Sequence, residues 1–135
     1  MKRHPYLRAY MAGVLLPSWF LLVVLTLYLL GHITAHIPAG LERAMMFPMA
    51  VVPNAWGLWN VLYLLFQFRK YISIGLFGAL LPVLLIPAGL VLSTALDLRF
   101  YSIGRAASGM PVVLAMYYLA WKYGVGSLNR MLDLH

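Results

Sequence analysis

Hydrophobic and polar positions divide the chain into four long apolar segments separated by short polar stretches. The segments run over residues 10–30, 45–66, 72–96 and 106–123. A helix of about 20 residues crosses the roughly 30 Å hydrocarbon core of a bilayer, so each segment is long enough to span it. The pattern predicts an all-α membrane protein, a four-helix transmembrane bundle formed as a single polytopic domain over residues 1–135. The tail after residue 123 is expected to fray or to lie on the membrane surface.

The overall composition agrees with this prediction. The chain is 64% hydrophobic and only 10% charged, whereas a typical soluble domain has about 25% charged residues. The four segments use nearly the whole chain, so we expect no separate soluble domain. The first expected partner is therefore the lipid bilayer.

The net charge of +7 is informative mainly through the positions of the basic residues along the chain. Basic residues lie at the segment ends and form no continuous stripe, so we expect no nucleic-acid partner. Seven of them fall on one side of the predicted bundle: Lys2, Arg3, Arg8, Arg69, Lys70, Lys122 and Arg130. Three fall on the other: Arg43, Arg99 and Arg105. The positive-inside rule then predicts both termini in the cytoplasm, in a bacterial cytoplasmic (inner) membrane.

Prolines interrupt the apolar segments, at Pro17, Pro53, Pro82 and Pro87. A proline inside a helix removes one backbone hydrogen bond and bends the helix, so we expect proline-kinked helices. In the first segment, one set of residues is spaced to share a helix face and is predicted to point toward the protein. The set is Ser18, Leu22, Leu25, Leu29, His32 and His36.

The second segment carries the most polar and aromatic side chains. Four of them are spaced to share one helix face, and we call them the polar stripe: Trp56, Asn60, Tyr63 and Gln67. An asparagine in hydrocarbon is costly unless it is hydrogen-bonded. The polar stripe is therefore predicted to face the interior, either bonded to other helices or lining a wet path.

The third segment carries small side chains on one face. We call this face the small-residue groove: Gly75, Ala79, Pro82, Gly89 and Ser93. Small residues let membrane helices approach closely. The connection between the second and third segments is short, so the two helices are predicted to be antiparallel neighbours. Trp56 and Asn60 are then expected to pack against the groove.

Candidate chemistry is sparse. His32 and His36 are spaced i, i+4 and face the same side of a helix, which makes them weak candidates for a metal site. A closed site needs three or four ligands, and we expect no metal and no other cofactor. There is no cysteine, and the acidic residues number three. No set of residues is predicted to be catalytic.

Three classes of function stay open, in a definite order. The first is a non-enzymatic accessory, assembly or interaction subunit of a larger membrane complex, with the polar stripe as structural contact. The second is a small-solute transporter or channel that acts as a homo-oligomer, with the polar stripe lining a path beside broken helices. The third is a membrane enzyme or cofactor carrier that uses His32 and His36.

Overall fold

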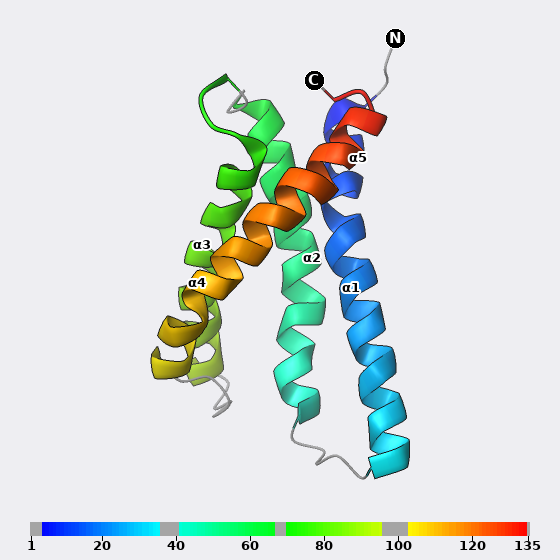
Figure 1. Cartoon of the computed structure of the whole chain (residues 1–135), viewed down its shortest axis with the longest axis vertical. Helices are drawn as coiled ribbons and strands as arrows, with labels where there is room; N and C mark the ends of the chain where they lie inside the picture. The colour runs from blue at the N-terminus through cyan, green and yellow to red at the C-terminus, as the bar shows by residue number, and fades with distance from the viewer. Residues whose placement is uncertain (1–3, 36–40, 67–69, 96–102, 135) are drawn as a thin grey trace.

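The structure is a computed structural model that describes residues 4–35, 41–66, 70–95 and 103–134, without the side chains of residues 35, 41–50, 105 and 106. It is all-helical (Figure 1). The elements in chain order are α1 (Pro5–Ala35), α2 (Leu41–Leu65), α3 (Ile74–Ala95), α4 (Ile103–Leu119), the π-helix η2 (Ala120–Val125) and α5 (Gly126–Met131). The last three follow one another without a break, so the fourth helix extends beyond its predicted end at residue 123.

The helices form two hairpins that meet at one end of the molecule. α1 packs along α2, and α3 packs along α4 and η2. The hairpins join where α5 contacts α1, so the start of α1 and the end of α5 lie at the same end of the bundle (Figure 1). Toward the opposite end, α3 and α4 diverge from α1 and α2 in the same view.

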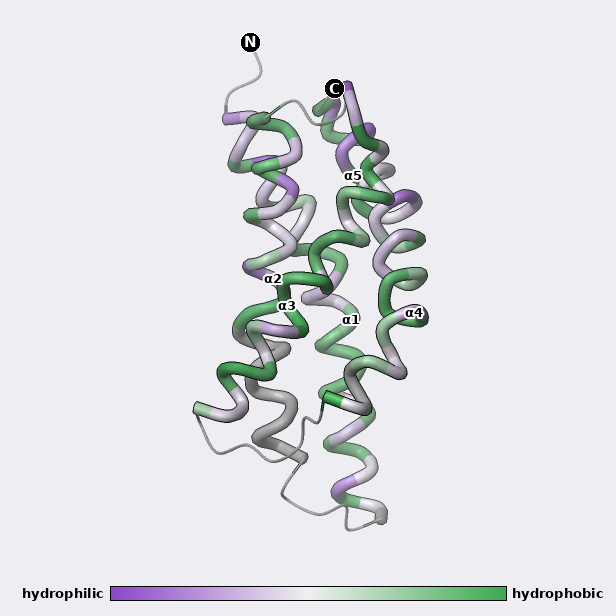
Figure 2. Tube along the Cα trace, turned by 90° about the vertical axis from the view of Figure 1, so that its left-hand side faces the viewer, coloured by the Kyte–Doolittle hydropathy of each residue, from purple (hydrophilic) through white to green (hydrophobic). Residues whose placement is uncertain are grey.

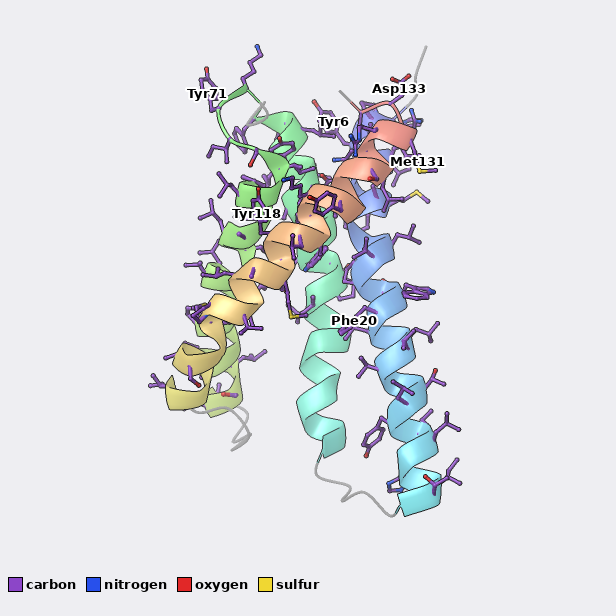
Figure 3. All side chains as sticks on the ribbon, viewed as in Figure 1. Tyr6, Phe20, Tyr71, Tyr118, Met131 and Asp133 are labelled. Carbon is purple, nitrogen blue, oxygen red and sulfur yellow. The ribbon has the colours of Figure 1, made fainter. Side chains whose placement is uncertain are left out.

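Among the described residues, two helices are long and apolar enough to cross a membrane, judged by length and composition: Pro5–Thr34 and Ile74–Ala95. Hydrophilic residues gather mostly near the end of the bundle that carries α5 and the start of α1, as the hydropathy colouring shows (Figure 2). Side chains project outward along both edges of the molecule in this view (Figure 3), and many of the exposed ones are large and apolar. Trp19 is 69% exposed and Val91 is 71% exposed. Extended apolar surface is typical of a face that lipid or another protein covers.

The buried core lies between α2, α3 and η2, near the end where the hairpins meet. Its members are Trp56, Tyr63, Phe77, Leu81, Trp121 and Val125. Trp121 and Val125 are fully buried on the π-helix. π-helical turns are rare and mostly appear as single wide turns inside α-helices. Here the wide turn lies where the fourth helix packs against α3 and contacts α1.

The predicted inward face of the first segment is wrong. Leu22 is 60% exposed and Leu29 is 50% exposed, and the buried residues of α1 lie in its first half. They are Ala9, Ala12, Gly13 and Pro17. Small side chains face α2 in this half, where the two backbones approach closely.

Candidate functional site

The polar stripe of α2 faces the interior at three of its four predicted positions. Trp56, Asn60 and Tyr63 are all buried, and Asn60 has no exposed surface. The fourth, Gln67, lies outside the described residues. The stripe therefore points toward α1, η2 and α5, where three chain segments far apart in sequence come together.

Asn60 is hydrogen-bonded to two other segments at once. Its Nδ2 donates to the Ala9 carbonyl of α1 at 2.8 Å and to Oδ1 of Asn129 in α5 at 2.8 Å. Asn129 returns the interaction, because its Nδ2 donates to Oδ1 of Asn60 at 2.9 Å. A buried amide without partners costs about 1–3 kcal/mol. The reciprocal amide pair removes this cost and links α1, α2 and α5.

Asn129 is itself held in place by the end of α5. Asp133 adopts the left-handed conformation with φ of 58°. The N–H of Asp133 donates to the Arg130 carbonyl at 3.0 Å, and the N–H of Leu134 donates to the Asn129 carbonyl at 2.9 Å. This pattern is a Schellman motif, which ends a helix and satisfies its last carbonyls. Leu134 is buried and Met131 is 81% exposed, so the described tail continues the helix and ends in a capped turn.

An aromatic cluster lies beside the amide pair. The ring of Trp56 is 5.0 Å from that of Tyr117 and 5.3 Å from that of Trp121, measured between centroids. These separations fall in the favourable range for aromatic pairs. The cluster joins α2 to α4 and η2. The interior next to Asn60 is thus filled by side chains that contact one another.

α2 and α3 meet near their connecting segment. The Trp59 ring stacks on Phe77 at 4.8 Å, and its Nε1 donates to the Phe77 carbonyl at 2.8 Å. The Tyr63 hydroxyl donates to the Ile72 carbonyl at 3.2 Å. The Tyr63 hydroxyl of the polar stripe and the nearby Trp59 indole therefore both bond to the protein backbone.

The small-residue groove of α3 receives side chains from the fourth helix. A Cβ built on Gly75 would lie 2.9 Å from the Tyr118 ring and 3.2 Å from Cβ of Lys122. A Cβ built on Gly78 would overlap Trp121. The structure thus places α4 and η2, rather than Asn60 of α2, against this part of the groove. A groove of small residues accepts any bulky side chain, so its composition does not select the helix that fills it.

The other residues of the small-residue groove differ in how deeply they are buried. Pro82 is fully buried and Ala79 is half-buried. Gly89 is also half-buried, whereas Ser93 is buried and its hydroxyl donates to the Leu90 carbonyl at 2.9 Å. The groove is therefore a packing surface mainly in its first half.

A second close contact, between α1 and α2, escaped the sequence analysis. A Cβ built on Gly13 would lie 2.8 Å from Cα of Gly57, backbone against backbone. Ala9 and Gly13 are spaced i, i+4, the small-xxx-small pattern that favours close helix packing in membranes. Beside this contact the Tyr10 hydroxyl donates to Oδ1 of Asn54. The spacing of Ala9 and Gly13 was the signal that could have located it.

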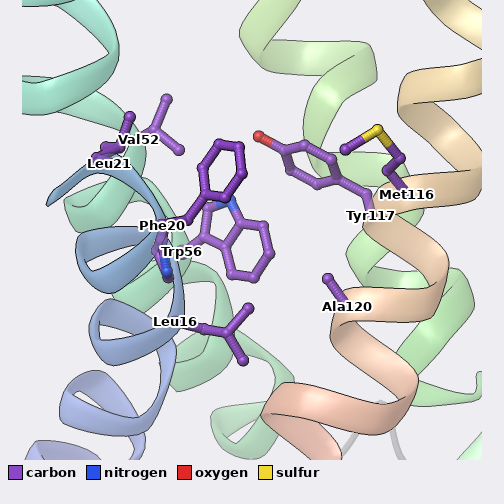
Figure 4. A pocket seen from close by; sticks show the side chains of 9 residues that line it. Leu16, Phe20, Leu21, Val52, Trp56, Met116, Tyr117 and Ala120 are labelled. Carbon is purple, nitrogen blue, oxygen red and sulfur yellow. The ribbon is translucent and has the colours of Figure 1, made fainter. Parts of the chain in front are cut away.

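An apolar crevice opens between the two hairpins, on the side of the core away from the amide pair. Its volume is about 290 Å³, and α1, α2, α4 and η2 line it (Figure 4). The lining residues are Leu16, Pro17, Phe20, Leu21, Val52, Trp56, Met116, Tyr117 and Ala120. The Tyr117 hydroxyl approaches the Trp56 indole N–H without reaching hydrogen-bond geometry. Apart from these two groups the lining side chains are apolar, so the crevice suits an apolar occupant.

The histidine pair is only half described. His32 is exposed near the end of α1, where its ring stacks on Tyr28 with a centroid separation of 6.0 Å. His36 lies outside the described residues. Within the described part of the chain, no group of three or more histidine and acidic side chains comes together.

Comparison of the chain with protein-family models, with curated proteins and with solved structures gives no match.

Proposed function

We propose that this protein is a four-span integral membrane protein with proline-kinked helices and both termini in the cytoplasm. The support is the position of the chain ends and of the charges. The start of α1 and the end of α5 lie together, as an even number of crossings requires. Arg8, Lys70, Lys122 and Arg130 belong to the side on which the sequence places its excess of basic residues.

Within the membrane, we propose a non-enzymatic role as an interaction or assembly subunit of a larger complex. The observation that carries this proposal is the reciprocal pair of Asn60 and Asn129. A polar residue that lines a solute path bonds to water or to substrate. Asn60 instead bonds to α1 and α5 and has no exposed surface. The polar stripe therefore acts as structural contact, and the protein is left with its apolar surfaces for binding.

The apolar crevice is the surface that we propose for the partner. It lies between the two hairpins, and its walls come from segments far apart in sequence. The amide pair and the aromatic cluster join the two hairpins at one end, and the crevice lies between them beside this junction. A partner that inserts an apolar helix face there would contact both hairpins at once.

The crevice proposal predicts a specific effect of Met116→Trp. Met116 is 55% exposed and lines the crevice, so an indole at this position fills the space. The protein is extracted from its own membranes with a lipid-preserving polymer and weighed by light scattering and mass spectrometry. We expect one other membrane protein at fixed stoichiometry, and we expect Met116→Trp to reduce its amount about tenfold or more, the equivalent of about 1.4 kcal/mol.

The matched control is Val91→Trp, on an exposed face of α3 away from the crevice. It should leave the amount of partner unchanged. If the extracted particle contains only copies of this chain and conducts solutes after reconstitution, the homo-oligomeric transporter is the right function. A partner lost equally in both variants would contradict the crevice as its binding site.

A further inference from the structure

A second cleft lies at the end of the bundle where the hairpins meet, beyond the amide pair. Its volume is about 410 Å³. It is lined by residues of α2, α3, η2, α5 and the segment after α5: Tyr63, Ile74, Lys122, Tyr123, Gly126, Asn129, Arg130 and Leu134. Nothing in the proposed subunit role uses this cleft.

Two cations flank the cleft, and none of the described residues that line it is acidic. Lys122 and Arg130 are both exposed. The Nζ of Lys122 lies 5.5 Å from the ring centroid of Tyr118 and 5.3 Å from that of Tyr123. Such cation–π contacts hold an ammonium group at a defined place without neutralising its charge.

The second cation is also positioned by a neighbour that leaves its charge intact. The guanidinium of Arg130 donates to Oγ of Ser127 at 3.2 Å. A guanidinium has five N–H donors in a planar fork, which suits the oxygen atoms of a phosphate. Arg130 and Lys122 thus offer positive charge and donors on two successive elements of one continuous helix.

The remaining lining residues favour a phospholipid over a free inorganic anion as the ligand. Ile74, Gly126 and Leu134 give the cleft an apolar part beside its charged part. Apolar surface contributes nothing to binding an inorganic anion, whereas it suits the glycerol and first methylene groups of a phospholipid. Tyr71 and Met131, at the same end of the bundle, are 82% and 81% exposed (Figure 3). Basic pockets of this kind between helix ends bind anionic headgroups in other membrane proteins.

We propose that this cleft binds the phosphate headgroup of an anionic phospholipid, between Lys122 and Arg130. The proposal rests on the membrane placement proposed above and is independent of the subunit role. The anionic lipid would hold η2 and α5 at the cytoplasmic surface, next to the amide pair that closes the bundle.

The test is native mass spectrometry of the purified full chain during stepwise removal of lipid. The probes are phosphatidylglycerol and phosphatidylcholine, added at equal concentration. We expect one phosphatidylglycerol to stay bound after phosphatidylcholine is lost. Each of Lys122→Gln and Arg130→Gln should weaken its binding about fivefold, the usual effect of one basic side chain at an anionic surface. The double variant should weaken it about 30-fold.

The control is Lys70→Gln, which removes the same charge from an exposed residue that does not line the cleft. It should leave the binding unchanged. An equal loss in Lys70→Gln, or equal retention of both lipids, would show general surface attraction and overturn the proposal. Displacement of the lipid by millimolar inorganic phosphate would show that the site takes a free anion, which also overturns it. A chain that stays soluble without detergent would instead contradict the membrane placement itself.

Discussion

Replacing Gly78 with alanine should lower the free energy of unfolding by about 2–3 kcal/mol, near the upper end of the usual cost of overpacking. The added Cβ would overlap the Cβ, Cγ and Cδ1 atoms of Trp121. Trp121 has no exposed surface, and its ring contacts that of Trp56 at 5.3 Å. The indole has no free space to move into, so α3 and η2 must separate. Unfolding by a denaturing detergent, followed by tryptophan fluorescence, measures the loss.

Gly109→Ala is the matched control for this change. Gly109 lies inside α4, and a Cβ built there meets no atom within 4 Å. Alanine is a better helix former than glycine by about 0.5–1 kcal/mol, so this variant should be slightly more stable than the native protein. Equal behaviour of the two variants would mean that η2 does not pack against α3 at Gly78.

Replacing Gly13 with alanine should cost at least as much, because both contacting groups are backbone. Its Cβ would lie 2.8 Å from Cα of Gly57 and closer still to the Trp56 carbonyl oxygen. A helix backbone cannot rotate away as a side chain can. The variant therefore pushes α1 from α2, and it stretches the bond of 2.8 Å from Asn60 to the Ala9 carbonyl. We expect a loss of about 3 kcal/mol or more in the same unfolding assay.

Gly104→Ala serves as the control for this second change. Gly104 lies in the first turn of α4, and a Cβ built there also meets no atom within 4 Å. A stability loss confined to Gly13→Ala supports the direct backbone contact. If Gly13→Ala is as stable as Gly104→Ala, the two helices are farther apart than the structure has them.

The sequence located the interior polar residues but not all of their partners. Asn60 is predictable as an inward residue because an unpaired amide in hydrocarbon is too costly. Its partner Asn129 is not predictable, because the preceding glycines, Gly124 and Gly126, are typical of the end of a helix. Both glycines lie within the continuous helix, and Gly124 is packed against Leu16. They allow a close approach, which only the three-dimensional packing reveals.

The first three helix segments were predictable to within about five residues at either end, since long apolar runs are a strong signal. The fourth continues through α5 to Met131, well beyond its predicted end at residue 123. The packing of the helices was not predictable. The groove of α3 suits a bulky stripe from α2 or from α4, and both helices offer one. Trp56 in α2 and Trp121 in η2 are both large aromatic residues, and spacing alone does not decide which of them lies against Gly78. The choice depends on where the hairpins cross.

The most direct measurement of the central claim is the access of water to position 60. The chain has no cysteine, so Asn60→Cys carries a single thiol. In lipid nanodiscs, where both membrane faces are accessible, His32→Cys at the exposed end of α1 supplies the positive control. We predict that a charged thiol reagent labels His32→Cys fully and leaves Asn60→Cys unlabelled until the protein is denatured. Labelling of folded Asn60→Cys at a rate close to that of His32→Cys would contradict the structural role of the polar stripe and favour a solute pathway.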